Sequence, residues 1–269
     1  MANSINTNYG AAVALQSLNK TNAQLETTQN RINTGMKVSS AKDNGAIFAI
    51  ATSQRANMGA QDAVRNSLQR GQSIIDVALA AGDTATSALE EMKALAVNIA
   101  SSTGDAQTAY LADYNALGKE VASALSGASF DGVNLWATAG LTNVTTNTSG
   151  GTFGIGFATN ISTSATLAAV NTGAIAATAA TTTAVDAALK TVTDSLATLG
   201  TQSKSVGRQI TFVNKLQDAT EAGIGNLVDA DLAKESAKLT ALQTKQQLGV
   251  QALSIANSSS SILLNLFRS

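Results

Sequence analysis

The chain has 269 residues, a net charge of −1 and a charged fraction of 13%, so it offers no basic surface excess for nucleic acid or an anionic membrane. The absence of cysteine and histidine excludes disulfides, thiolate metal sites, a Ser-His-Asp triad and a histidine-based zinc-protease motif. The chain also lacks proline, and aromatic residues make up only 4% of it. These features favour long uninterrupted helices that pack closely through small and aliphatic side chains.

The N-terminus is polar where a Sec signal peptide would have a basic segment followed by an apolar run. No stretch reaches the roughly 18 consecutive apolar residues of a transmembrane helix, so we expect no membrane insertion. The sequence is compatible with a cytoplasmic protein and with export by a route that reads another signal.

Two helical regions flank a softer middle. Residues 5–128 and 184–268 show the hydrophobic spacing of helices, whereas residues 130–183 are rich in Thr, Gly, Asn and Ser. Within the middle, aromatic and aliphatic residues alternate with small ones after a turn cluster, which predicts a half-buried strand at Phe153, Ile155 and Phe157.

Each end of the chain carries a narrow apolar seam with a period of seven residues. The N-terminal seam comprises Leu18, Leu25 and Ile32. The C-terminal seam runs on two adjacent tracks and includes small residues where another helix could approach: Leu232, Leu239, Leu242, Gly249, Leu253, Ala256 and Leu263. Each terminal segment, about 30 residues long, would extend about 45 Å as a helix.

Pairing these two segments would bury one stripe of each and leave other apolar residues in water, notably Ile262, Leu263, Leu264, Leu266 and Phe267. Burial of one such side chain contributes roughly 1.5–3 kcal/mol, so the exposed set is a strong drive to associate. Two interpretations follow: a long helical hairpin within an ordinary bundle, or termini that become ordered only on assembly.

Helix boundaries can be read from short polar signals. We expect a break at Gly35 and a new helix after Ser40 and Asp43, which fit the S-x-x-D form of a helix start. That helix continues to Ile99, and Asp105 is placed to cap the next one. Three glycines inside the longer helix are expected to mark close helix contacts: Gly59, Gly71 and Gly82.

No motif amounts to a catalytic constellation. Gly154-Ile155-Gly156 lacks the third glycine and the following helix of a nucleotide-binding loop, so it indicates a strand with a close backbone approach. Asp229 and Asp231 are better placed to cap the last helix than to bind a metal. The neighbouring Glu90 and Glu91 are expected on a solvated helix face.

Short motifs at both ends occur in a characteristic order and spacing. They are Ile5–Asn8, Arg31–Gly35, Ser40–Asp43, Ala63–Asn66, Phe130–Leu135, Arg208–Ile210, Asp229–Glu235 and Leu263–Arg268. Together they resemble those of bacterial flagellin, the filament subunit of the flagellum, and the resemblance covers all of the chain except its middle.

The resemblance implies a mainly α fold, with a long antiparallel helical coiled coil and rod formed by the N- and C-terminal segments and a small β-hairpin-rich central insertion. Residues 1–40 and 229–269 would form the terminal coiled coil of the inner filament core, disordered in the monomer. Residues 41–135 with 184–228 would form the helical rod, and residues 136–183 a small variable surface element.

The resemblance also implies a structural protein, not an enzyme, that polymerises with itself into the extracellular flagellar filament for motility. Implied partners are hook-associated and cap proteins, an export chaperone on the C-terminal helix and the type III export apparatus; no cofactor, metal or nucleic acid is expected. The expected assembly residues are Leu18, Leu25, Ile32, Leu232, Leu239, Leu242, Leu253, Leu263, Leu264, Leu266, Phe267 and Arg268.

The chain departs from the family pattern at three places, one of which, Phe48 in place of a usual Leu or Met, is expected to affect packing only. In Leu89–Val97, Glu91 stands where many flagellins have Arg and Ala94 where they have Glu, beside Lys93. The flagellin-sensing Toll-like receptor recognises this surface in many flagellins. Reversing one charge and losing another should weaken the electrostatic match between this surface and the receptor, so we expect poor detection. Asn257–Ser260 replaces a proline-containing turn, so the last helix is expected to run straighter.

Three alternatives are weighed against flagellin. A hook–filament junction protein shares flagellin-like ends but would adapt rather than propagate. A flagellin-like enzyme with a protease domain would need a larger middle and a set of catalytic side chains. A coiled-coil adhesin or tail fibre would need longer unbroken heptads.

Overall fold

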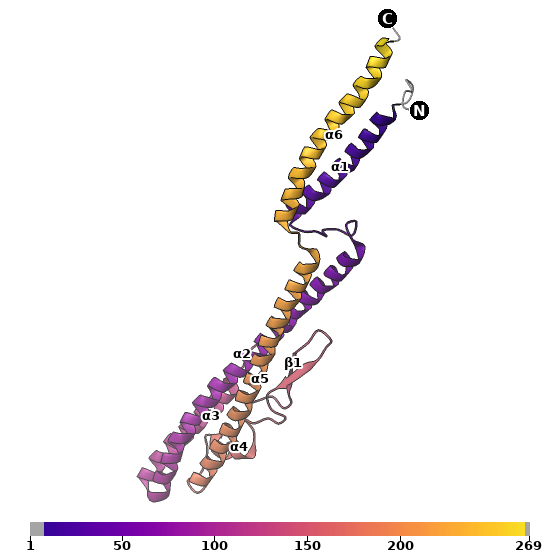
Figure 1. Ribbon diagram of the computed structural model, residues 1–269. Helices are drawn as coiled ribbons and strands as arrows, with labels where there is room; N and C mark the ends of the chain where they lie inside the picture. The colour runs from indigo at the N-terminus through magenta and orange to yellow at the C-terminus, as the bar shows by residue number, and fades with distance from the viewer. Residues whose placement is uncertain (1–7, 267–269) are drawn as a thin grey trace. The chain divides into compact units, whose positions relative to one another are not determined.

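The computed structural model describes residues 8–266, with side chains as far as Ser258. These residues fall into two compact units, a terminal unit made of the residues up to Ala56 and from Thr220 on, and a central unit spanning Asn57–Ala219. The fold is mainly α with one small hairpin, as predicted (Figure 1). The elements are α1 (Tyr9–Thr34), α2 (Gly45–Ser101), α3 (Asp105–Gly127), β1 (Thr142–Thr145), β2 (Thr152–Ile155), α4 (Ala165–Asn171), α5 (Thr182–Val228) and α6 (Leu232–Leu266).

In the terminal unit, α1 has a well-defined start and end. The Asn8 side-chain oxygen accepts a hydrogen bond from the Ala11 amide at 2.9 Å, which satisfies one of the open donors of the first turn. Gly35 ends the helix in the left-handed region at φ 70°, a conformation that favours glycine. The predicted break at Gly35 is confirmed.

The predicted helix after Ser40 and Asp43 is present, but the S-x-x-D motif does not cap it. Helix α2 begins at Gly45, where the Asn44 side chain accepts a hydrogen bond from the Ile47 amide at 3.1 Å. One carboxylate oxygen of Asp43 instead accepts from the amides and hydroxyls of Ser39 and Ser40, at 2.9–3.1 Å. The S-x-x-D pattern therefore closes a turn that precedes the helix.

The start of α6 follows the sequence prediction. Asp231 accepts a hydrogen bond from the Lys234 amide at 3.1 Å and caps the helix. Asp229 instead pairs with Met36 in an isolated antiparallel bridge. Helix α6 continues unbroken through residues 257–260, where the family pattern has its proline turn.

The central unit is built around a continuous apolar core to which α2, α3, α5 and the middle of the chain all contribute. Aliphatic side chains dominate it, in keeping with the low aromatic content. Its largest fully buried side chains are Leu68, Ile75, Leu89, Met92, Ile99, Tyr114, Leu125, Leu135, Trp136, Ile155, Leu167 and Leu199.

Trp136 is the largest anchor of this core. Its side chain is fully buried, its indole N–H donates to the Ala78 carbonyl at 2.8 Å, and its ring lies 5.5 Å from that of Phe157. Gly82 makes room for it, since a Cβ there would lie 2.7 Å from the indole and 2.5 Å from Leu196. Through Trp136, the middle of the chain packs against α2 and forms a hydrogen bond to it.

The hairpin pairs β1 with β2 in antiparallel register, with Val144 opposite Phe153. The strand is shorter than predicted, because Gly156, at φ 96°, ends it before Phe157. Ile155 and Phe157 are buried as the alternation indicated.

Two of the three glycines in α2 mark close contacts. Besides Gly82, Gly71 lies against Val144 of the hairpin rather than against a helix, whereas a Cβ at Gly59 would meet open space. Asp105 is the first residue of α3 instead of its cap, and Gly104 occupies the cap position.

Candidate assembly surface

Helices α1 and α6 of the terminal unit lie side by side (Figure 1) and pack through the predicted seams. On α1, Leu18, Leu25 and Ile32 are half-buried, while on α6, Leu242 is only 7% exposed. Two further seam residues of α6 are half-buried, Leu239 and Leu253. The structure therefore brings six of the predicted residues to one contact between helices.

Leu232 departs from this arrangement because it remains 48% exposed at the first turn of α6. Leu263, Leu264 and Leu266 lie in α6 at positions whose side chains are outside the described set, and Phe267 and Arg268 lie outside the described residues. The assembly role of all these residues stays a prediction.

Small residues allow the two helices to approach closely. A Cβ built on Gly249 would lie 3.3 Å from Cδ1 of Leu18, and one on Gly10 would lie 3.9 Å from Cβ of Ala256. The sequence pointed to Gly249 and Ala256 as such positions. A larger side chain at Gly249 would have to displace Leu18.

Polar contacts fix the register of the pair along its length. Asn8 donates to the Ala256 carbonyl at 2.7 Å, and Gln246 donates to the Asn22 side chain at 2.8 Å. At the other end, an ion pair joins Arg31 to Glu235 at 3.1 Å, with the Glu235 side chain only 12% exposed. The helices are thus held in one register by polar groups spread from end to end.

The base of the pair is joined to the start of α2 and the end of α5 within the terminal unit. The Lys37 amide donates to the Val228 carbonyl at 2.6 Å, and the Ala230 amide donates to the Gly35 carbonyl at 2.9 Å. A small core lies beside these bonds, formed by Val38, Ala51, Ile224 and Val228. The pair therefore has an anchored base.

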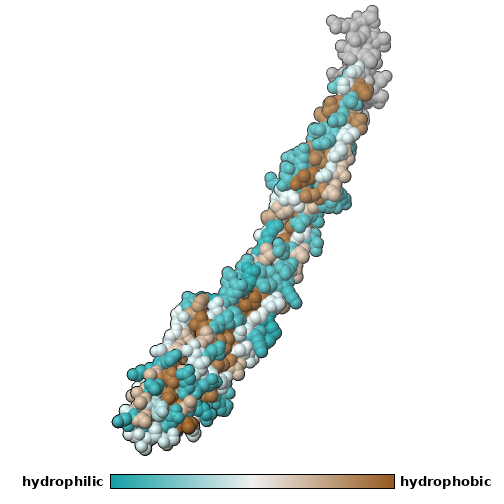
Figure 2. All heavy atoms as spheres, turned by 90° about the vertical axis from the view of Figure 1, so that its left-hand side faces the viewer, coloured by the Kyte–Doolittle hydropathy of each residue, from teal (hydrophilic) through white to brown (hydrophobic). Residues whose placement is uncertain are grey.

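Beyond the seam, both helices present large apolar side chains to solvent. Ile255 is 68% exposed, Leu248 59% and Tyr9 75%. Figure 2 shows hydrophobic atoms at the surface along these helices, interleaved with hydrophilic ones. Among the residues whose side chains the structure describes, the exposed large apolar residues of the pair are Tyr9, Val13, Leu15, Leu232, Leu248, Val250 and Ile255, which we call the outward stripe.

Sequence analysis by heptads missed most of the outward stripe. Leu248 and Ile255 are seven residues apart with Ala252 between them, so the periodic signal was present on α6 beside the seam tracks. A helix that is apolar on more than one face requires more than one neighbour. The pairing of α1 with α6 satisfies only one of these faces.

A second predicted surface lies on the central unit. Glu91 and Ala94 are exposed on α2, as is Glu90, in agreement with the predicted solvated face. Lys93 is also exposed, and its ammonium group lies 2.6 Å from an Asp186 carboxylate oxygen on α5. Lys93 therefore already has an acidic partner within the chain.

The described residues give little basis for other kinds of site. Within them, no group of three or more acidic side chains is arranged to hold a metal ion. Over the same range, none of the helices combines the length and the hydropathy needed to span a membrane.

Two family models match the chain. The model described as the bacterial flagellin N-terminal helical region matches residues 5–140, and the one described as the bacterial flagellin C-terminal helical region matches residues 182–267. Between them lie residues 141–181, which hold the hairpin and α4 and which neither model matches.

Curated relatives align along the whole chain. Flagellin FljM of Caulobacter vibrioides is 53% identical over 270 residues, and flagellin FljN of the same organism is 54% identical over 271, with 99% of both chains covered in each case. A flagellin of Brucella melitensis is 38% identical over 279 residues, covering 98% of this chain and 99% of its own.

Proposed function

We propose that this chain, which belongs to the bacterial flagellin family, propagates its filament through the paired terminal helices α1 and α6. Flagellins are the structural subunits of the extracellular flagellar filament, so the chain is a self-polymerising structural protein of motility and not an enzyme. Nothing in its relatives favours the hook–filament junction protein.

The outward stripe carries this proposal. Seven large apolar side chains remain at least 46% exposed on two helices that have already packed against each other. Burying each of them against a neighbouring subunit would contribute roughly 1.5–3 kcal/mol, which offsets the entropy lost when the helices are held in a polymer. Contacts between unlike faces of successive copies generate an open fibre where the rotation from copy to copy does not close a ring.

The proposal assigns a role to each part of the chain. Residues 1–40 and 229–269 form the inner coiled-coil core and order on assembly, residues 41–135 with 184–228 form the outer rod, and residues 136–183 form the variable surface. The anchored base at Gly35, Val38 and Val228 supports the first boundary, because the backbone bonds there connect both terminal helices to their neighbours.

Further partners follow from the family role. The export chaperone holds α6 before secretion through the type III apparatus, because α6 carries several exposed apolar residues of the monomer. Hook-associated and cap proteins contact the filament ends through the same terminal helices. Binding of the chaperone to wild-type α6, but not to a variant with polar residues on the outward stripe, tests this assignment.

The surface at Glu91, Lys93 and Ala94 predicts weak detection by the flagellin-sensing Toll-like receptor. Lys93 is engaged by Asp186, and Glu91 presents a negative charge where the family pattern has a positive one. Restoring the family charges with Glu91→Arg and Ala94→Glu should raise the response in a receptor-reporter assay. A full-strength response to the unchanged chain would contradict the prediction.

Seeded polymerisation tests the main proposal. Purified chain is incubated with short filament fragments, pelleted and imaged by electron microscopy. Wild-type chain should form long uniform filaments, and deletion of Leu263–Ser269 should abolish them while circular dichroism shows the rod still folded.

A matched pair of full-length variants distinguishes the effect of shortening the chain from the effect of losing its apolar side chains. Changing Leu263, Leu264 and Leu266 to serine should reproduce the loss, whereas changing Ser259, Ser260 and Ser261 to alanine should not. Normal filaments from the truncated chain would refute the role of this end. Chain that only coats the ends of seeds would point to the junction protein.

A further inference from the structure

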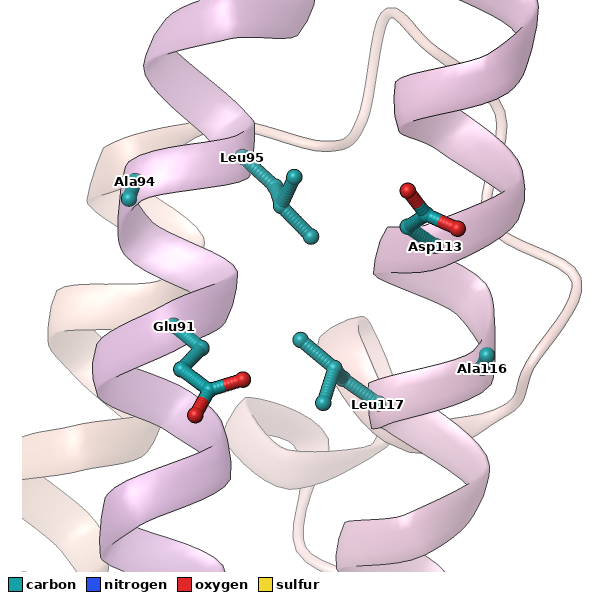
Figure 3. Close-up of a pocket in the computed structure, with 6 residues that line it drawn as sticks. All are labelled: Glu91, Ala94, Leu95, Asp113, Ala116 and Leu117. Atoms are coloured by element: carbon teal, nitrogen blue, oxygen red, sulfur yellow. The ribbon is translucent and has the colours of Figure 1, made fainter.

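An open groove of about 480 Å³ lies between α2 and α3 of the central unit. Figure 3 shows Leu95 and Leu117 pointing toward one another across it, with Glu91 and Asp113 on opposite helices beside them. The remaining lining residues are small, Ala94 and Ala116. The groove therefore combines an apolar floor with a carboxylate on each side.

Among the described residues, no cation forms an ion pair with either of these carboxylates. Lys93, the basic residue closest in sequence, makes its ion pair with Asp186 on α5 at 2.6 Å. In the part of the chain that the structure describes, neither Glu91 nor Asp113 takes part in an ion pair or a side-chain hydrogen bond. The groove thus favours a positively charged ligand that also brings apolar surface.

Helix α5 carries a face with the complementary properties. Arg208, Phe212 and Lys215 are spaced at i, i+4 and i+7, so they share one side of the helix. All three are exposed, and Phe212 is 57% exposed. Among the described residues, neither Arg208 nor Lys215 forms an ion pair. Two cations therefore flank an exposed aromatic ring.

This face cannot reach the groove of its own chain. The ion pair between Lys93 and Asp186 fixes the level of α5 that lies beside the groove. Arg208 lies some 22 residues further along α5, which is about 33 Å of helix.

We propose that the acidic groove between α2 and α3 receives the Arg208–Lys215 face of α5 from a second copy of this chain. In this contact Phe212 covers Leu95 and Leu117, while the two cations lie near Glu91 and Asp113. Groove and face belong to different helices, so one copy can offer both at once and the contact can repeat from copy to copy. The inference rests on the proposed function and names one of its contacts in the rod.

Charge reversal on full-length chains tests the pairing. Glu91→Lys with Asp113→Lys, and separately Arg208→Glu with Lys215→Glu, should each raise the critical concentration for seeded assembly about tenfold at low salt. A chain with all four changes should return to within about twofold of wild type, because opposite charges face each other again. Asp83→Lys with Glu90→Lys is the matched control, since it makes the same net charge change on α2 outside the groove.

Cross-linking gives an independent readout, because the chain has no cysteine of its own. Filaments grown from a mixture of Ala116→Cys and Thr211→Cys chains should form a disulfide between copies on oxidation. Thr198→Cys is the control on the same helix, exposed and located ten residues, about 15 Å of helix, before Arg208. A band with Thr211→Cys and none with Thr198→Cys supports the contact.

The outcomes separate the two proposals. Assembly of all charge variants at the wild-type concentration, or equal cross-linking at both positions of α5, would overturn the groove contact and leave the terminal-helix proposal intact. Wild-type chain that forms no filament and no cross-link would overturn both. Loss in each two-charge variant with recovery in the four-charge chain would support the groove contact.

Discussion

The central and terminal units differ in how completely they bury their apolar side chains. In the central unit a continuous core removes large side chains such as Leu68, Leu89 and Trp136 completely from solvent. Among the described side chains of α1 and α6, the least exposed are those of Thr21, Thr28 and Leu242. One unit therefore completes its core within the chain, whereas the other leaves apolar surface for a neighbour to cover.

In the terminal unit, polar side chains occupy buried positions while large apolar side chains face solvent. The hydroxyl of Thr21 bonds back to the Ser17 carbonyl within its own helix at 2.9 Å, so it adds nothing to the adhesion between α1 and α6. Leu248, Val250 and Ile255 have the apolar area that such adhesion needs, but they face outward. The sequence of the terminal unit thus favours association between copies over stability of a single copy.

The largest effect is expected from removing the anchor of the central unit. Trp136→Ala should cost about 3–5 kcal/mol in the free energy of unfolding, because it deletes a fully buried ring and the hydrogen bond to the Ala78 carbonyl. Urea unfolding of the monomer followed by circular dichroism measures it. Val97→Ala, at a 54% exposed site, should change stability by no more than about 0.5 kcal/mol.

A loss of the same size in both variants would contradict the idea that the central unit is held by its own core. A large loss in Trp136→Ala alone would support it.

Substitutions in the outward stripe should have the opposite effect. They should change the stability of the monomer little and the critical concentration for assembly strongly. Leu248→Gln with Ile255→Gln removes two exposed apolar side chains, and should raise the critical concentration at least about tenfold, since each burial is worth roughly 1.5–3 kcal/mol. Pelleting at a series of protein concentrations measures it. Ser236→Gln, also exposed on α6, is the control.

If the stripe variant unfolds more readily than wild type but assembles normally, these side chains stabilise the monomer and the contrast between the units fails.

Much of this architecture was predictable from local patterns. The proline-free apolar repeats predicted the helices, Gly35 predicted the end of α1, and Asp231 predicted the cap of α6. The seams at Leu18 and Leu242 were found because a single contact between two helices follows a seven-residue period.

What sequence analysis missed depended on surroundings that a local pattern does not contain. Ser40 and Asp43 fit a helix start, yet their bonds close a turn ahead of Asn44. The contact of Gly71 with Val144 joins residues that are far apart in the chain. The groove at Leu95 and Leu117 exists only because α3 returns beside α2.

An intermediate effect is expected from the ion pair within the terminal unit. Glu235→Gln leaves the partly buried Arg31 without its charged partner and should weaken the pairing of α1 with α6 by about 1–3 kcal/mol. Hydrogen exchange of the amides in residues 21–34 within assembled filaments measures it, and exchange in the central unit should stay unchanged. Lys190→Gln, which removes an exposed ion pair with Asp194, is the control and should change exchange little.

The smallest effect concerns the turn before α2 in the terminal unit. Hydrogen bonds from the amides of Ser40 and Ser39 and the hydroxyl of Ser39 lower the pKa of the Asp43 carboxyl, because they favour its charged form. A carboxyl whose folded pKa is depressed adds stability above its unfolded pKa, and that stability is lost as the pH falls through the folded value, below about pH 4. In wild type, the protection of the amides in residues 39–47 from hydrogen exchange should fall as the pH drops below about 4, and Asp43→Asn should remove this acid limb. The control is Asp218→Asn, which removes an exposed carboxylate of the central unit and should leave the pH dependence as in wild type. An acid limb that persists in Asp43→Asn would assign the pH dependence to another group and remove this turn from the features that distinguish the terminal unit.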